Sequence, residues 1–108
     1  MTLNYTAPNN CMAVTGKLAV QNNGVKDLYV DITETSQTCH PVDGAICTIN
    51  PLPFGTYNIL ITSSCFQSTY RIDGGGNTIT ITTYNGQYST VITTNSTYPN
   101  IGINVGCY

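Results

Sequence analysis

Cysteine and histidine are the side chains with the most versatile chemistry in this sequence. It contains a single histidine, His40, and five cysteines, which are Cys11, Cys39, Cys47, Cys65 and Cys107. Thiolate and imidazole groups are the ligands that zinc prefers, and Cys39, His40, Cys47 and Cys65 supply both types. Their spacing matches no common zinc finger or ribbon, and two adjacent ligands rarely share a tetrahedral site comfortably. We therefore expect disulfides beside a loop histidine, and no metal.

The cysteines are numerous for a short chain, which is typical of proteins that fold outside the cytosol. Their number is odd, so one thiol is left over if two disulfides form, and several pairings are compatible with the sequence. We prefer Cys39 with Cys47, across the short loop between them, and Cys11 with Cys107, which would tie the two ends together. Cys65 would then be buried or available to a neighbouring chain.

Other residues that can do chemistry lack the setting for it. His40 is the one histidine, the side-chain type that most often acts as a base in catalysis, and no nearby serine or cysteine shows the setting of a nucleophile. Asp43 and Asp73 each precede a glycine and begin no series of calcium ligands, so we interpret them as turn formers. The glycines at 74–76 precede a strand pattern, whereas a phosphate loop precedes a helix. We expect no enzyme activity and no cofactor.

Composition excludes several classes of protein. A chain of 108 residues forms one domain, and only 7% of its residues are charged, with a net charge of -2. Three cations, Lys17, Lys26 and Arg71, cannot neutralise a nucleic-acid backbone. No run approaches the roughly 18 apolar residues of a membrane-spanning helix. Eight tyrosines argue against disorder. The uncharged polar surface and the cysteines indicate an extracellular, cell-surface or virion protein.

The first residues show neither a basic segment nor an apolar signal core. Either a signal has been removed, or the protein leaves its cell without one, as a virion component does. Asn4 and Asn95 satisfy the acceptor pattern for N-glycosylation, which agrees with an extracellular location.

Alternation of apolar and polar residues with a period of two predicts an all-β sandwich, with no helical period anywhere. Turn signals at 21–24, 73–76 and Asn85-Gly86 separate the segments, and Asn-Gly is the preferred pair of a tight β-hairpin. Residues 36–42 are expected to form a loop. The eight expected strands are 11–20, 28–35, 45–50, 56–63, 66–72, 77–84, 87–94 and 100–106.

The stretch 43–66 is the centre of this pattern. Asp43-Gly44 predicts a turn, and Pro51 and Pro53 lack backbone N–H groups, so we expect no regular ladder from Asn50 to Phe54. Gly55 reverses the chain. The strand that follows places Tyr57, Ile59 and Ile61 on one face. In the strand at 66–72, Phe66, Ser68, Tyr70 and Ile72 are expected to share a face.

The same stretch resembles a known family. Asp43-Gly44, then Leu52-Pro53-Phe54-Gly55-Thr56-Tyr57, and finally Cys65-Phe66 are similar to the Asp-Gly, Leu-Pro-x-Gly-Thr-Tyr and closing aromatic of the Cna protein B-type and carboxypeptidase regulatory-like domains. The resemblance covers roughly residues 16–70. It implies an Ig-like or transthyretin-like sandwich of seven to eight mostly antiparallel strands. Such domains serve mostly as stalks, adhesin modules, pilin domains and appended structural units.

Some members of the Cna protein B-type family join a lysine on the first strand to an asparagine on the last, beside an acidic residue. The resemblance therefore implies Lys17, with Asn100 or Asn104, and Glu34 as the ingredients of an internal amide bond. Amide formation needs a neutral, buried amine. The family usually carries its acid in the strand after the Gly-Thr-Tyr corner, and residues 58–63 contain none. We expect a solvated Lys17.

The hairpin expected at 77–94 would present a polar surface. Alternation places Thr78, Thr80 and Thr82 on one face, and Tyr84 and Tyr88 lie beside the turn. A flat array of threonines with tyrosine rings suits a carbohydrate or another β-edge, because a tyrosine ring has an apolar face and a polar tip. High β-propensity alone also explains the threonines.

We expect two parts, an extended N-terminal arm at residues 1–10 and a single β-sandwich domain at residues 11–108. Either the arm or the last strand could add to an open sheet edge of a neighbour, because strand addition depends mainly on main-chain hydrogen bonds. The sequence thus favours a structural subunit of an extracellular filament or a virion surface, whose partners are copies of itself. The alternative is a carbohydrate-binding or adhesion module with a glycan as its partner.

Overall fold

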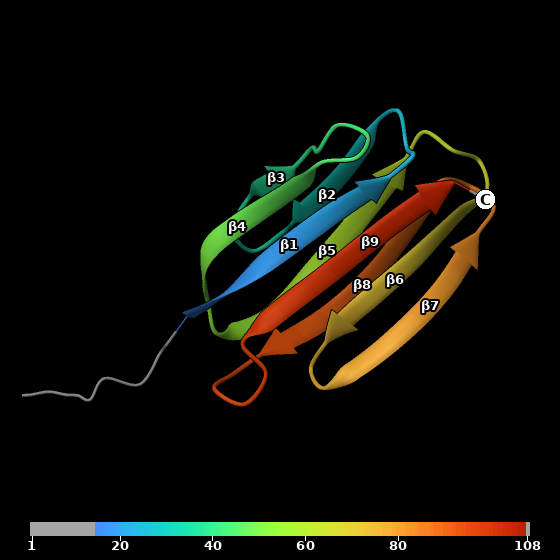
Figure 1. The fold of residues 1–108 in the computed structure, drawn as a ribbon. Coiled ribbons are helices and arrows are strands. Elements are labelled where there is room, and N and C mark those ends of the chain that lie inside the picture. The colour runs from blue at the N-terminus through green and yellow to red at the C-terminus, as the bar shows by residue number, and fades with distance from the viewer. Residues whose placement is uncertain (1–14, 108) are drawn as a thin grey trace, which may run out of the picture.

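The computed structural model describes residues 15–107, which form nine strands in two facing sheets (Figure 1). Within this range there is no helix, and so none that could span a membrane. The all-β sandwich predicted from the sequence is confirmed, with nine strands in place of seven or eight. The expected arm at 1–10 lies outside the described residues. The strands are β1 (Thr15–Asn23), β2 (Leu28–Ile32), β3 (Gln37–Cys39), β4 (Ile46–Pro53), β5 (Gly55–Ser63), β6 (Ser68–Gly74), β7 (Asn77–Thr83), β8 (Gln87–Thr94) and β9 (Asn100–Cys107).

The two sheets contain unequal numbers of strands. One has five, in the order β4-β1-β9-β6-β7, and the other has four, in the order β3-β2-β5-β8. Neighbouring strands are antiparallel except β1 and β9, which are parallel. β3 packs against β4 across the sandwich, and β8 packs against β6 and β9. β7 therefore lies at the margin of the larger sheet, beyond β8, with no strand opposite it (Figure 1).

The core lies between the sheets and follows the period of two. Tyr57, Ile59 and Ile61 of β5 are all buried, as their alternation predicts. Every strand of residues 15–107 contributes at least one buried side chain, except β7. The core is therefore built by eight strands, and β7 extends the sheet past it. The largest fully buried side chains are Tyr70, Leu18, Leu28, Ile32, Leu52, Ile59, Ile61, Ile101, Ile103, Val20, Val25 and Val30.

The hairpin expected around Asn85-Gly86 does not form. β7 pairs with β6 and β8 pairs with β5, so the turn between them crosses from one sheet to the other. Gly86 has a φ of 72°, and a Cβ there would lie 2.6 Å from the carbonyl oxygen of Ser63. Its N–H donates to Phe66 and its carbonyl accepts from Ser63. The glycine is thus needed for close packing on the β5–β6 loop, and not for a two-stranded hairpin.

β4 continues to Pro53, past its expected end at Asn50, but its ladder with β1 is irregular there, as the prolines predict. Leu18 of β1 pairs with Ile49, yet Gly16 pairs with Leu52, so the register shifts by one residue between them. The bulge takes up the extra residue in β4. Because β4 is an edge strand, proline nitrogens that lack a proton can face away from β1.

Three other expectations are wrong. Residues 37–39 form β3, which is too short for alternation to reveal. Phe66 does not share the buried face of Tyr70, because β6 begins only at Ser68 and Phe66 is 73% exposed in the preceding loop. The last strand, β9, lies between β1 and β6, so it is already paired on both sides and has no free edge to offer a neighbour.

Candidate functional site

The open margin, which we define as β7 together with β8, exposes part of the inner surface of the sandwich. Ile79 and Ile81 pair with Ile72 and Tyr70 of β6, so they lie on the sheet face that elsewhere forms the core. Ile79 is nevertheless 38% exposed, because no strand covers β7. A shallow cavity of about 170 Å³ lies here. It is lined by Ile72, Gly74, Asn77, Ile79, Thr90, Val91 and Ile92.

Both strands of the open margin are unprotected edges. β8 pairs with β5 on one side only, so every second residue directs its N–H and C=O groups away from the sheet. Edge strands are usually blunted by charges, by proline or by being very short. β7 has seven residues and β8 has eight, and neither contains a charged residue or a proline. The open margin therefore lacks the usual protections of a sheet edge.

A second hollow lies at one end of the sandwich, around the β6–β7 turn. Tyr98 is 47% exposed, and its ring packs on Gly76, where a Cβ would lie 2.7 Å from Cζ of the tyrosine. Asp73 accepts a hydrogen bond from Thr78 and lies 3.8 Å from the guanidinium of Arg71. The cavity measures about 380 Å³. Its lining residues are Asp73, Gly74, Gly75, Gly76, Asn77, Thr78, Thr97, Tyr98, Pro99, Asn100 and Gly102.

The residues expected to form one polar surface separate in the structure. Thr78, Thr80 and Thr82 are exposed on the outer face of β7, and Tyr84 is exposed beside the turn. Tyr88 is half-buried and stacks on Tyr70, with the ring centroids 5.6 Å apart. Tyr88 therefore faces the inside of the sandwich. Because β8 and β7 lie in different sheets, Tyr88 is not part of the surface that carries the threonines.

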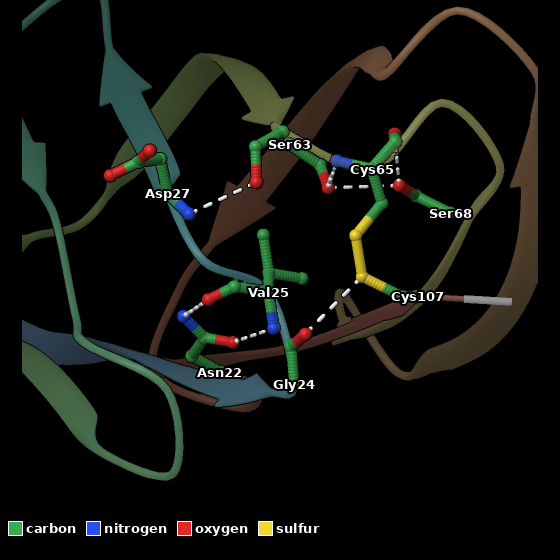
Figure 2. Close-up of a disulfide and its surroundings, with 9 residues drawn as sticks. Asn22, Gly24, Val25, Asp27, Ser63, Cys65, Ser68 and Cys107 are labelled. Atoms are coloured by element: carbon green, nitrogen blue, oxygen red, sulfur yellow. Dashed lines mark hydrogen bonds between the residues drawn. A yellow bond between two sulfur atoms is a disulfide. The ribbon is translucent and has the colours of Figure 1, made fainter.

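Two disulfides are present among the described residues. Cys39 bonds to Cys47 and so links β3 to β4, the two edge strands opposite the open margin. Cys65 bonds to Cys107 (Figure 2), in place of the pairing expected between Cys107 and Cys11. Cys11 lies outside the described residues. Cys65 is thus not a leftover thiol.

The register of β9 explains why Cys107 meets Cys65. Cys107 lies opposite Ser68 of β6, just after the loop that carries Cys65. The Ser68 hydroxyl is 2.9 Å from both the Ser63 hydroxyl and the Cys65 carbonyl oxygen, which holds that loop against the end of β9 (Figure 2). Strand pairing brings these residues together over a sequence separation of 42. Sequence spacing gives no sign of it.

Asn22 is a structural residue that sequence reasoning missed. It is fully buried near the end of β1, where its side chain exchanges hydrogen bonds with the backbone of Val25 (Figure 2). Its side-chain amide also donates to the carbonyl oxygen of Pro41 at 2.9 Å. It thereby links the loop between β1 and β2 to the loop between β3 and β4. The surrounding Asn-Asn-Gly reads only as a turn signal, which hides this role.

The candidate zinc ligands are engaged elsewhere. Cys39 and Cys47 are oxidised, and the His40 ring stacks on Tyr29 at 4.0 Å with its Nδ1 lying 2.8 Å from the carbonyl oxygen of Leu28. Within residues 15–107, no three His, Cys, Asp or Glu side chains gather where they could hold a metal ion. Asp43 lies exposed in the turn before β4.

The residues implied for an internal amide bond are only partly brought together. Lys17 lies directly opposite Asn100 in the parallel β1–β9 pair, but both are exposed. Asn104 lies further along β9. Glu34 lies in the turn between β2 and β3, which belong to the other sheet. Its carboxylate accepts hydrogen bonds from the backbone and side chain of Asn58. These bonds hold the Glu34 pKa below its usual value. Lys17 thus has neither the burial nor the acidic partner that amide formation requires.

Of the two glycosylation acceptors, Asn95 is exposed in the β8–β9 loop. Its side-chain oxygen accepts hydrogen bonds from the backbone N–H groups of Thr97 and Tyr98, at 3.0 and 2.9 Å. Asn95 therefore also shapes the loop that carries Tyr98. Asn4 lies outside the described residues.

Comparisons with known proteins relate this chain to a fold. No protein-family model matches the sequence, and no curated protein matches it. Two crystal forms of a bacterial adhesin from Mobiluncus mulieris, which contains intramolecular disulfide, isopeptide and ester bond cross-links, superpose with a TM-score of 0.55. Identity is 13% and 12%, over 85% and 84% of this chain. The match spans 40% of the adhesin chain. At this identity the likeness shows the fold alone: this chain is a β-sandwich domain of the kind found in that adhesin.

Proposed function

We propose that this protein is a non-enzymatic structural module of the cell surface or extracellular space, which associates with copies of itself by strand addition. The observation that carries the proposal is the open margin, with its uncharged edge strands and its uncovered isoleucines. An unpaired edge with apolar side chains beneath it favours the addition of a strand, since main-chain hydrogen bonds and apolar burial then act together.

The N-terminal arm is the terminal segment proposed to make the addition. β9 already has β1 and β6 as neighbours, so the C-terminal strand has no edge to share. Residues 1–10 precede β1 and contain no charged residue. Fold likeness to an adhesin and the two disulfides support the proposed location outside the cytosol.

Deletion of residues 1–10 tests the role of the arm. We expect the wild-type protein to form filaments or other assemblies in electron micrographs, and the shortened protein to remain monomeric in light scattering. Circular dichroism should show the same β-sheet signal for both proteins, because all nine strands lie after the deletion. Assembly that persists in a folded, shortened protein would reject the arm, and a monomeric wild-type protein at millimolar concentration would reject the function.

A carbohydrate-binding role is the second candidate, favoured by the Tyr98 hollow. It combines an exposed aromatic ring with a carboxylate and amides in a cavity of about 380 Å³, which is within the size range of ligand pockets. A glycan array with wild-type protein and Tyr98→Ala tests it. Binding that Tyr98→Ala abolishes supports this role, whereas a blank array on folded protein excludes it.

A further inference from the structure

We infer that the open margin is the binding site of one particular strand, residues 1–7 of a second copy. This strand runs antiparallel to β8 and lies over the inner face of β7. This inference rests on the proposed self-association and adds the acceptor, the added segment and its direction. A fifth strand beside β8 would give each sheet five strands and would cover β7.

The acceptor has the shape that a strand requires. Ile79 and Ile81 of β7 form its floor, and β8 forms its wall with a free row of main-chain groups. A cavity of about 170 Å³ already separates the two strands. Apolar side chains that enter from the new strand would cover Ile79, and this removal of apolar surface from water favours the addition.

The sequence of residues 1–7 matches this acceptor. Thr2, Asn4 and Thr6 alternate with apolar residues, which are Met1, Leu3, Tyr5 and Ala7. In a strand, the apolar set would therefore face the floor and the polar set would face solvent. Pro8 ends the segment, because proline cannot donate to the ladder. Paired with β8, whose eight residues span roughly 27 Å, residues 1–7 would cover nearly the whole strand.

Direction follows from where β1 begins. Thr15 lies opposite Pro53, and Thr94 lies opposite Gly55, so β1 begins at the end of the sandwich where β8 finishes. An arm that leaves this end and enters the next molecule in a head-to-tail stack reaches β8 at Gln87 and runs antiparallel to it. An arm that folded back into its own molecule would run parallel to β8. Antiparallel pairing is slightly more stable and more common, which favours the second copy.

Residues 8–14 supply the connection between molecules. Seven residues reach at most about 25 Å when extended, which is enough to pass from one sandwich to the margin of the next. All molecules in such a stack point the same way, so the assembly is a polar filament. Each molecule contributes one arm and one acceptor.

Two double substitutions, one on each face of the proposed strand, test the added segment in the 108-residue chain. Leu3→Asp with Tyr5→Asp places two carboxylates against the floor, whereas the matched control, Thr2→Asp with Asn4→Asp, places the same charge on the solvent face. We expect the first pair to weaken assembly at least about 100-fold, because buried unpaired carboxylates are costly, and the control to assemble. Equal behaviour of the two pairs would overturn the assigned face.

The acceptor is tested by Ile79→Asp, with Thr80→Asp on the outer face of the same strand as its control. Both residues are exposed in the single molecule, so both variants should fold with wild-type circular dichroism spectra. We expect Ile79→Asp alone to lose assembly, by a similar factor. If a folded Ile79→Asp protein assembles while the deletion of 1–10 does not, the assigned binding site is wrong and the proposed function stands. If the folded deletion variant also assembles, residues 1–10 are not the added segment and the inference is wrong, whereas a wild-type protein that stays monomeric rejects the proposed function itself.

Photo-cross-linking tests direction and distinguishes a neighbour from a self-contact. Benzoylphenylalanine in place of Leu3 should attach near Ile92–Thr94 of another molecule, and in place of Ala7 near Gln87–Ser89. Peptides linked between isotopically light and heavy copies would support a second copy. Links only within one molecule would show that the arm returns to its own sandwich, and reversed positions would show the wrong direction; either result would overturn the inference.

Discussion

The two margins of this sandwich differ in almost every property that controls strand pairing. At one margin β3 has only three residues, β4 contains Pro51 and Pro53, and a disulfide joins Cys39 to Cys47 across the sheets. At the open margin β7 and β8 are long, uncharged and free of proline. Short strands and prolines are the usual protection of sheet edges. We call the first margin, β3 with β4, the closed margin, because it carries these protections, and the open margin lacks them.

The margins also differ in what lies beneath them. β3 faces β4, and Cys39 is fully buried at the closed margin. β7 faces no strand, and Ile79 remains partly exposed. A sandwich of five strands on four thus leaves part of the inner face of β7 uncovered. This exposure is a property of the whole arrangement and not of any single residue.

The largest expected effect comes from comparing two isoleucines. Ile59→Ala should lower the free energy of unfolding by about 2–5 kcal/mol, since Ile59 is 2% exposed in the core. Ile79→Ala should lower it by less than about 1 kcal/mol, because much of its side chain already meets water. Urea unfolding in the Leu3→Asp, Tyr5→Asp background measures both without assembly. Equal losses would mean that β7 is packed and the margin is not open.

Removal of the closed margin's disulfide should have an intermediate effect. Cys39→Ala with Cys47→Ala should cost about 2–4 kcal/mol, because the bond restricts the unfolded chain and holds the short β3 in place. Hydrogen exchange should then accelerate in β3 and β4 and remain unchanged in β7 and β8. Faster exchange throughout the open margin would show that the two margins are not independent.

The smallest effect concerns Glu34, which joins the β2–β3 turn to β5 near the closed margin. Hydrogen bonds from the backbone and then the side chain of Asn58 lower the Glu34 pKa below its usual value, so its contribution to stability is present at neutral pH and is lost as the pH falls through the lowered pKa. Melting temperatures of wild type and Glu34→Gln should differ at pH 7 and converge near pH 3. A constant difference across this range would contradict the assignment.

The strands and their faces follow from local sequence. Alternation identifies the buried side of β5 through Tyr57, Ile59 and Ile61, because side chains of a strand point to opposite faces whatever the partner is. The same rule places Ile79 and Ile81 on one face of β7. This alternation does not show that the face is uncovered, because an apolar residue has the same sequence pattern whether or not a strand of the other sheet covers it.

Pairing between distant segments was decided by tertiary structure. Asn85-Gly86 has the chemistry of a hairpin turn, yet it connects two sheets. β7 pairs with β6 and β8 pairs with β5, so β7 and β8 do not pair with each other. Cys107 meets Cys65 through the register of β9 on β6. The open margin likewise depends on how many strands each sheet contains. A sequence determines the faces of its strands, and only the folded arrangement determines which of those faces remain free.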